Sequence, residues 1–271
     1  MIGETGVNVV KAEAVTSPAN PLLKEIRRAI ARGARTSEGF CVAETFHLLE
    51  EALTSGCDMG AVLAAESAQS AVEAQLRRRP QTRLLVLADA LFRSLSDTET
   101  AQGVMALVRP PQWDLDRLFT GQPLVVVLDG VQDPGNAGSI IRAAEAFGAT
   151  GLVFLKGTVS PYNPKAVRAS AGSIFRVPLV TALDAAAARA ALEAHGLDVY
   201  AAAPSGAKNL DEAGLTRGCA FVIGSEGRGV SPEWTAGAAG LRIPTRGVES
   251  LNAATAAAIL LYEARRQRAR L

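Results

Sequence analysis

The sequence lacks the features that would place it in a specialised class of protein. No apolar run approaches the roughly 18–20 residues that a membrane-spanning helix needs. The first ten residues hold neither a basic segment nor a long apolar core, so we expect no signal peptide and no membrane partner. The three cysteines, Cys41, Cys57 and Cys219, match no metal-ligand or disulfide spacing. They predict packing residues, no metal site and a reducing, cytoplasmic compartment.

An excess of charge of one sign is also missing, because 28 basic and 27 acidic residues leave a net charge of +1. The net charge therefore does not indicate nucleic acid, but one local cluster does. The cluster opposes the apolar face of a predicted amphipathic helix, and it consists of Lys24, Arg27, Arg28, Arg32 and Arg35. Two interpretations stay open: an ordinary solvated helix face, or a stripe that binds RNA phosphates.

Turn signals and shifts of composition divide the 271 residues into four parts. Residues 1–20 are expected to be a tail and entry loop, and residues 21–107 alternate helical and strand patterns as a small α/β domain does. Residues 108–122 contain Pro110-Pro111 and Gly121, which is typical of a linker. Residues 123–271 then form a second domain.

The second domain shows the pattern of a parallel sheet with helices on both faces. Its apolar runs alternate with stretches of helical spacing, as in such sheets. The expected strands span residues 124–129, 151–155, 199–203, 219–224 and 241–244. The last segment, residues 251–268, is rich in Ala and Leu without Gly or Pro, and predicts a helix. The fold class is therefore α/β.

Three loops of unusual composition each follow or adjoin an expected strand of this domain. The first contains Asn136, Gly138 and Arg142, but it has neither the glycine spacing of a dinucleotide site nor the Lys-Ser/Thr pair of a P-loop. This absence disfavours a nucleotide-binding oxidoreductase. Arg142 is expected to project from the buried stripe of its helix toward the turn that bears Asn136. Its alternative is a surface salt bridge, for which Glu145 is available.

The second and third loops add glycines, a carboxylate and two small polar residues. Residues 224–229 place three glycines around Glu226, more than a tight turn needs. The third loop has the arrangement G-x-x-S-x-N from Gly247 to Asn252, and either Ser250 or Asn252 could simply cap the last helix. Because ligands of open α/β sheets bind at the carboxyl ends of strands, we expect the loops to form a site there.

Taken together, the three loops resemble the sequence motifs of the SpoU (TrmH-like) branch of the SPOUT RNA methyltransferases, in the family's order, from about Pro123 to Glu263. The motifs are N-x-G-x-x-x-R at 136–142, I-G-S-E-G-x-G at 223–229 and I-P-x-x-G-x-x-S-L-N at 243–252. The resemblance implies S-adenosylmethionine as cofactor, an RNA substrate, a homodimer formed through the C-terminal domain and a deep trefoil knot. Nothing in periodicity or spacing indicates the knot.

The N-terminal domain is similar to the L30e/L7Ae-type substrate-binding domain that many members carry. The similarity rests on residues 95–98 and 102–104, and one departure is Ala43, where an acidic-glycine pair is expected. This domain implies a folded substrate such as large-subunit (23S-type) ribosomal RNA. A transfer RNA methyltransferase and a catalytically silent RNA-binding assembly factor are the alternatives.

The resemblance also implies roles for individual residues. The expected cofactor contacts are Ala201, Ile223, Gly224, Gly229, Ile243 and Leu251. The expected catalytic group is Arg142, Asn136, Glu226, Ser250 and Asn252, and Lys165 and Arg168 are further expected RNA contacts.

Neither histidine, His47 or His195, lies in a motif. A guanidinium stays protonated because its pKa is above about 12. We therefore expect Arg142 to hold the ribose hydroxyl and a phosphate rather than to act as a base.

Overall fold

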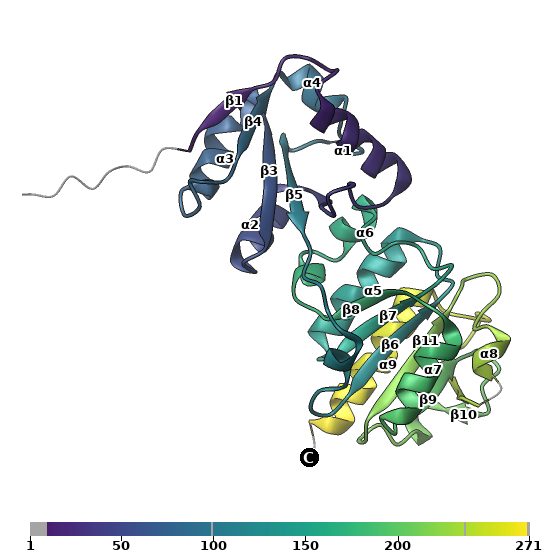
Figure 1. The fold of residues 1–271 in the computed structure, drawn as a ribbon. Coiled ribbons are helices and arrows are strands. Elements are labelled where there is room, and N and C mark those ends of the chain that lie inside the picture. The colour runs from purple at the N-terminus through teal and green to yellow at the C-terminus, as the bar shows by residue number, and fades with distance from the viewer. Residues whose placement is uncertain (1–9, 99, 236, 270–271) are drawn as a thin grey trace, which may run out of the picture. The chain divides into compact units, whose positions relative to one another are not determined.

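The computed structural model describes residues 10–98, 100–235 and 237–269. The chain divides into two compact units (Figure 1). The first unit ends at Pro110 and also includes Tyr162–Pro164, and the second comprises Pro111–Pro161 and the residues from Lys165 onward.

The first unit is built on a five-stranded sheet in the order β1-β4-β3-β5-β2. β1, β4 and β3 are parallel, whereas β5 runs antiparallel to β3 and β2. The strands are β1 (Ala12–Ala14), β2 (Cys41–Glu44), β3 (Asp58–Ala65), β4 (Leu84–Leu87) and β5 (Val104–Arg109). The helices are α1 (Pro21–Arg32), α2 (Phe46–Thr54), α3 (Gln69–Leu76) and α4 (Asp89–Arg93), with a short 3₁₀ turn η1 (Glu66–Ala68).

Helix α1 shows how local sequence sets these bounds. The Asn20 side chain accepts a hydrogen bond of 2.9 Å from the Leu22 backbone N–H, with Pro21 in the first helical position. The helix ends at Gly33, whose φ of 58° suits glycine. Leu23 and Ile26 are fully buried, so the basic residues of α1 lie on its exposed side.

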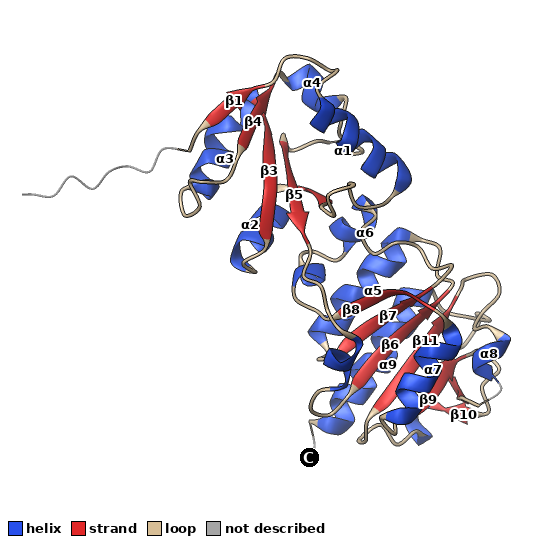
Figure 2. Cartoon of the chain, viewed as in Figure 1, coloured by secondary structure: helices blue, strands red, loops and turns tan. Residues whose placement is uncertain are grey.

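The second unit is built on a seven-stranded parallel sheet in the order β10-β12-β9-β11-β6-β7-β8 (Figure 2). Its strands are β6 (Leu124–Asp129), β7 (Gly151–Leu155), β8 (Leu179–Leu183), β9 (Asp198–Ala202), β10 (Lys208–Asn209), β11 (Cys219–Gly224) and β12 (Ala239–Arg242). Its helices are α5 (Pro134–Ala146), α6 (Pro164–Ala169), α7 (Ala185–Ala194), α8 (Pro232–Thr235) and α9 (Ala253–Arg268). Three 3₁₀ turns complete it, η2 (Leu115–Phe119), η3 (Ser173–Phe175) and η4 (Leu210–Glu212).

Both faces of this sheet are covered, as its continuous apolar strands require. Val125 and Val127 of β6 join Ala188 and Leu192 of α7 in one buried cluster. Alternate residues point to the other face, where α5 and α9 pack against each other. The expectation of an α/β protein with a parallel C-terminal sheet is confirmed, while the trefoil knot stays a prediction.

Two short elements lie in the segments expected to be a tail and a linker. β1 falls within residues 1–20, and its three exposed residues pair with β4. Such a short exposed strand has no apolar alternation that would reveal it. β5 continues to Arg109, inside the expected linker 108–122. Within the same segment, η2 places Leu118 in the core of the second unit.

The cysteines confirm their predicted packing role, because Cys41, Cys57 and Cys219 are all buried. Burial raises the pKa of the Cys219 thiol to about 11, so it stays protonated at neutral pH. No helix in the described parts of the chain is long and apolar enough to cross a membrane.

Candidate cofactor and catalytic site

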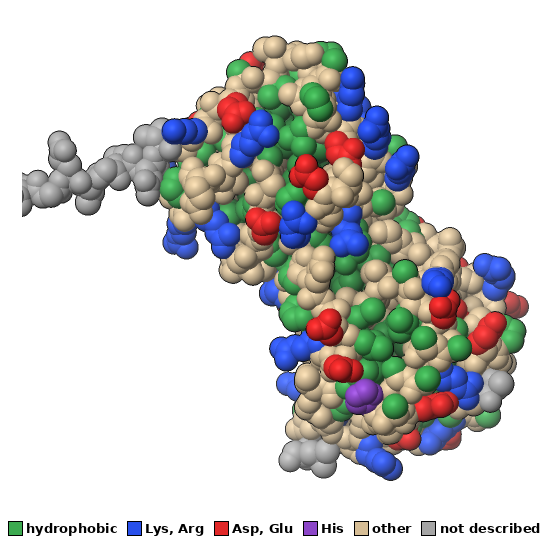
Figure 3. All heavy atoms as spheres, viewed as in Figure 1, with side chains coloured by type: hydrophobic (Ala, Val, Ile, Leu, Met, Phe, Trp, Pro, Cys, Tyr) green, Lys and Arg blue, Asp and Glu red, His purple; other side chains and the backbone are tan. Residues whose placement is uncertain are grey.

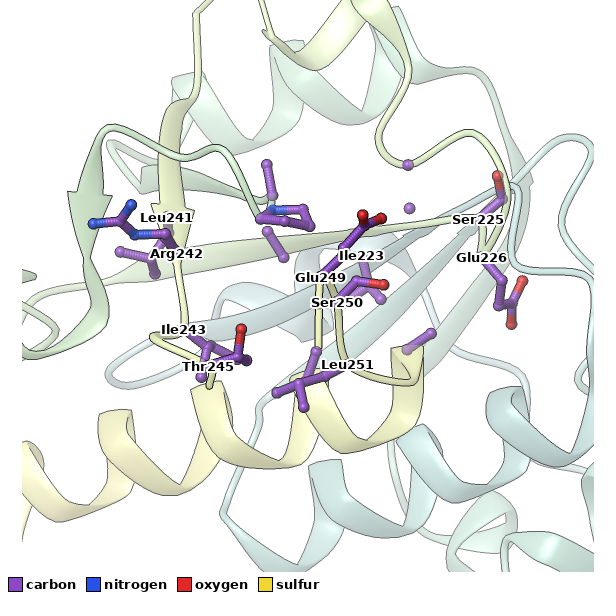
Figure 4. A pocket seen from close by; sticks show the side chains of 17 residues that line it. Ile223, Ser225, Glu226, Leu241, Arg242, Ile243, Thr245, Glu249, Ser250 and Leu251 are labelled. Carbon is purple, nitrogen blue, oxygen red and sulfur yellow. The ribbon is translucent and has the colours of Figure 1, made fainter. Parts of the chain in front are cut away.

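A cavity of about 280 Å³ lies at the carboxyl ends of β9, β11 and β12 (Figure 4). Its walls come from residues 202–204 at the end of β9, from residues within 223–229 at the end of β11, and from residues within 241–256, from the end of β12 to the first turn of α9. Ligands of open parallel sheets bind at this edge. Two of the three sequence motifs therefore line one cavity.

The loop after β11 folds back tightly over the strand end. Ser225 and Gly229 exchange two backbone hydrogen bonds of 2.9 and 3.1 Å. A Cβ on Gly224 would lie 2.1 Å from the Gly229 carbonyl carbon, so a side chain there would displace the loop. Gly229 has a φ of +68°, whereas a Cβ on Gly227 would meet nothing within 4 Å. Gly224 and Gly229 are thus the two glycines that this loop requires.

A chain of side-chain hydrogen bonds joins all three motifs at one end of the cavity. Asn136, near the N-terminus of α5, donates from Nδ2 to the Glu226 carboxylate over 2.6 Å. Asn252, before α9, donates from Nδ2 to Asn136 Oδ1 over 2.9 Å. Asn252 Oδ1 in turn accepts from the backbone N–H groups of Ala254 and Thr255 at 2.9 and 3.2 Å.

The N-terminus of α9 fixes the direction of this chain of bonds. Because two N–H groups donate to Asn252 Oδ1, its amide nitrogen must face Asn136. Asn136 can then accept only through its oxygen, and its nitrogen is left to donate to Glu226. Asn252 therefore has two roles: it caps α9, and it sets the orientation of the Asn136 amide. Capping alone does not explain why an asparagine stands at this position. Ser250 lines the cavity and does not cap the helix.

Replacement of Asn252 by aspartate separates these two roles. Aspartate caps a helix about as well as asparagine, but it has no N–H to donate to Asn136 and sets a second negative charge near Glu226. We expect Asn252→Asp to change the free energy of unfolding by less than about 1 kcal/mol and to lower kcat by tenfold or more, on the order of one lost hydrogen bond. Thermal unfolding and methyl-transfer assays measure the two effects. Full activity in the folded variant would show that Asn252 only caps the helix.

Most of the predicted cofactor contacts lie on the cavity. Its lining includes Ile223, Gly224, Gly229, Ile243 and Leu251. The prediction of Ala201 as a cofactor contact needs correction. Ala201 is 2% exposed and does not line the cavity, whereas Ala202 and Ala203 do. Ala201 pairs with Val222 and Gly240 inside the sheet, one residue before β9 ends at Ala202, so it lies within the strand and not in the loop that follows. Glu249 also lines the cavity. It stands at an unspecified position of the third motif, so no separate signal in the sequence identifies it.

Arg142 lies on α5 outside the residues that line the cavity, and its side chain is exposed. Within the described parts of the chain it makes no hydrogen bond or ion pair. Glu145, its alternative partner, instead binds Arg176 over 2.5 Å, and this contact lowers the pKa of the Glu145 carboxyl. The surface salt bridge considered for Arg142 is therefore not formed, and its guanidinium remains available to a ligand.

The basic cluster of the first unit is partly engaged by the protein itself. Arg27 donates to the Pro18 carbonyl over 2.9 Å, and Arg28 lies 3.7 Å from Glu25. Arg35 stacks 4.5 Å above the ring of Tyr162, which belongs to the same unit. Lys24 and Arg32 are exposed on α1, along which basic side chains gather in Figure 3. The two further expected contacts, Lys165 and Arg168, lie on α6.

Comparisons with known proteins agree with the two-unit division. The family model described as the SpoU rRNA Methylase family matches residues 123–262, and the model of the MRM3-like substrate binding domain matches residues 20–106. The 23S rRNA (guanosine(2553)-2′-O)-methyltransferase RlmP of Bacillus subtilis is 31% identical over 253 residues, covering 93% of this chain and 98% of RlmP.

Solved structures are similar over nearly the whole chain. The SpoU methyltransferase AviRb from Streptomyces viridochromogenes, in complex with the cofactor AdoMet, superposes with a TM-score of 0.84 at 31% identity over 92% of this chain and 98% of its own. An AdoMet-bound rRNA methyltransferase from Sinorhizobium meliloti gives a TM-score of 0.82 at 29% identity, covering 94% and 98%.

Proposed function

This chain belongs to the SpoU rRNA methylase family, as its three motifs indicated, and we propose that it transfers a methyl group from S-adenosylmethionine to a ribose 2′-oxygen of ribosomal RNA. The observation that carries the proposal is the bonded chain Glu226–Asn136–Asn252 beside the cavity at the strand ends. These hydrogen bonds bring the three motif loops together in one site. A catalytically silent protein would need the fold but not this arrangement of side chains.

The cavity fits S-adenosylmethionine by its chemistry. Ile223, Ile243 and Leu251 offer apolar surface to an adenine. Because Gly224 and Gly229 carry no side chain, the backbone can approach the ligand closely. Bound there, the cofactor supplies an activated methyl group on a positively charged sulfur.

The residues of the chain orient the acceptor. Ser250 and the amides of Asn136 and Asn252 position the target ribose beside the cavity, and Glu226 braces the loop through Asn136. Holding two reactants in line can contribute about 7–11 kcal/mol. Arg142 contacts the 2′-hydroxyl and an adjacent phosphate, and its fixed positive charge stabilises the negative charge that develops on the oxygen as the proton leaves to water.

The proposed substrate is large-subunit (23S-type) ribosomal RNA. Two features support this choice: a substrate-binding domain matched at residues 20–106, and the 23S rRNA named as substrate of RlmP. Lys24 and Arg32 on α1, together with Lys165 and Arg168 on α6, would bind phosphates. We place this reaction in the cytoplasm.

Transfer of labelled methyl from S-adenosylmethionine to unmodified large-subunit rRNA, small-subunit rRNA and tRNA, each assayed separately, tests the substrate. We expect label on large-subunit rRNA alone. Label on tRNA alone would show that the substrate is transfer RNA, and the proposed methyl-transfer reaction would still hold. No label on any RNA, together with no binding of S-adenosylhomocysteine, would contradict the enzyme function.

We also propose that the protein is a homodimer through the α5–α9 side of its second unit. A groove there is lined by Asn136, Ser139 and Phe147 of α5 and by residues of α9 that include Ile259 and Tyr262. Tyr262 is 54% exposed and one of two exposed large hydrophobic residues described, and its ring packs edge-on against Phe147 at 5.8 Å. The groove as a whole supports the dimer, because contiguous apolar surface, unlike a single exposed side chain, is typical of association sites.

A charge placed in this groove is expected to separate the protomers. Tyr262→Glu would bury a carboxylate at the interface without a partner. We expect sedimentation velocity to show a dimer for the wild type and mainly monomer for the variant. Ala187→Glu is the matched control, because Ala187 is exposed on α7, which covers the other face of the sheet. A wild type that sediments as a monomer at micromolar concentration would refute the dimer.

A further inference from the structure

One charged side chain of the cavity has no partner among the residues that the structure describes. Three charged residues line it: Glu226, Arg242 and Glu249. Glu226 accepts from Asn136, and Arg242 donates to Asn209 Oδ1 over 2.8 and 3.1 Å. Glu249 makes no hydrogen bond or ion pair with any described residue. Its carboxylate therefore gives the cavity an uncompensated negative charge.

Glu249 lies midway along the cavity. In Figure 4, Leu241, Ile243 and Thr245 line one end and Ser225 and Glu226 the other. The Glu249 side chain extends from the loop between them, toward the end of β11 near Ile223. The carboxylate thus lies between the end lined by Leu241, Arg242, Ile243 and Thr245 and the end that carries the hydrogen-bonded network.

The groups of the proposed cofactor follow the same order along the molecule as these parts of the cavity. Its adenine suits the end at which Leu241 and Ile243 offer apolar surface, and its methyl group must face the polar network at which the ribose is positioned. The sulfur that joins them, and carries the positive charge, then falls in the middle of the cavity. We infer that Glu249 binds this positive charge and so makes the site prefer S-adenosylmethionine to its uncharged-sulfur product, S-adenosylhomocysteine. This inference rests on the proposed function.

The consequence is a built-in preference for the reactive form of the cofactor. Loss of the methyl group removes the positive charge from the sulfur, and the attraction to Glu249 ends with it. The product then binds more weakly than the substrate, which favours exchange after each turnover. Because Glu249 is exposed, solvent and salt screen the attraction, and the preference is modest and salt-dependent.

Three ligands separate the sulfur charge from other contacts. S-adenosylmethionine and sinefungin carry a positive charge at this position, as a sulfonium and an amine, whereas S-adenosylhomocysteine does not. Calorimetric titration of the whole protein at about 50 mM and about 300 mM salt gives their affinities under weak and strong screening. Two variants are compared: Glu249→Gln removes the negative charge, and Glu249→Asp keeps it. Glu50→Gln, an exposed carboxylate on α2, is the matched control.

At the lower salt we expect Glu249→Gln to weaken the two charged ligands about five- to tenfold and S-adenosylhomocysteine less than twofold, with the difference shrinking at the higher salt as screening increases. Glu249→Asp should keep part of the preference, and Glu50→Gln all of it. Equal weakening of the three ligands, or no weakening, would overturn the inference while the proposed function stands. A wild type that binds none of them would overturn both.

Discussion

Replacement of Arg142 by alanine is expected to lower kcat about 10²–10³-fold, the typical effect of removing one preorganised donor from a developing oxyanion. The affinity for S-adenosylhomocysteine should not change, because Arg142 does not line the cavity. Stability should not change either, since the exposed side chain makes no hydrogen bond or ion pair within the described structure. The variant therefore separates chemistry from cofactor binding and from folding.

Two further variants sharpen this prediction. Arg142→Lys keeps the charge but cannot contact a hydroxyl and a phosphate with one planar group, so we expect it to stay well below wild-type activity. Arg217→Ala removes another exposed arginine at the amino end of β11, at the opposite edge of the sheet from the cavity, and should retain nearly full activity. Single-turnover methyl transfer measures all three. Near wild-type rates in Arg142→Lys would contradict the two-point contact.

Replacement of Arg268 by alanine is expected to destabilise the second unit by about 3–5 kcal/mol, because hydrogen bonds from a charged donor contribute about 1.5–3 kcal/mol each. The Arg268 guanidinium donates to four backbone carbonyls, those of Leu215, Gln122, Pro123 and Arg217, at 2.6 to 3.1 Å. The guanidinium therefore connects the C-terminal end of α9 to the segments that precede β6 and β11. Its loss leaves these carbonyl groups without a partner.

Both tryptophans of the sequence lie in the second unit, and Trp234 is 1% exposed, so denaturant unfolding followed by tryptophan fluorescence reports on that unit. Arg265→Ala, on the exposed side of the same helix, is the control and should stay within about 0.5 kcal/mol of the wild type. A change of less than about 1 kcal/mol in Arg268→Ala would show that these bonds are replaced by water.

Much of the second unit could be predicted because its signals are local. Residues 124–129 and 151–155 were predicted as strands from continuous apolar runs, and β6 and β7 have these bounds. β8 was not predicted individually, since its residues at the sheet edge are mostly half-exposed and show no continuous apolar pattern.

The residues of the site were predictable as types but not as contacts. The motifs identified Asn136, Glu226 and Asn252. Asn136 is 90 positions before Glu226 and 116 positions before Asn252, and it forms a hydrogen bond with each of them. No local pattern specifies which amide faces which carboxylate, because the direction depends on the N-terminus of α9. Glu249 was missed for a related reason: only its placement in the cavity, and not its neighbours in sequence, distinguishes it from an ordinary surface carboxylate.

The most direct test of the account is the position of the transferred methyl group. Large-subunit rRNA labelled by the wild-type protein is digested with alkali, which requires a free 2′-hydroxyl to cleave the chain. The account predicts label in an alkali-resistant dinucleotide, which shows a ribose 2′-O-methyl group, and at least about a hundredfold less of this product with Arg142→Ala at the same reaction time. Label recovered instead on a base, in mononucleotides, would contradict the account.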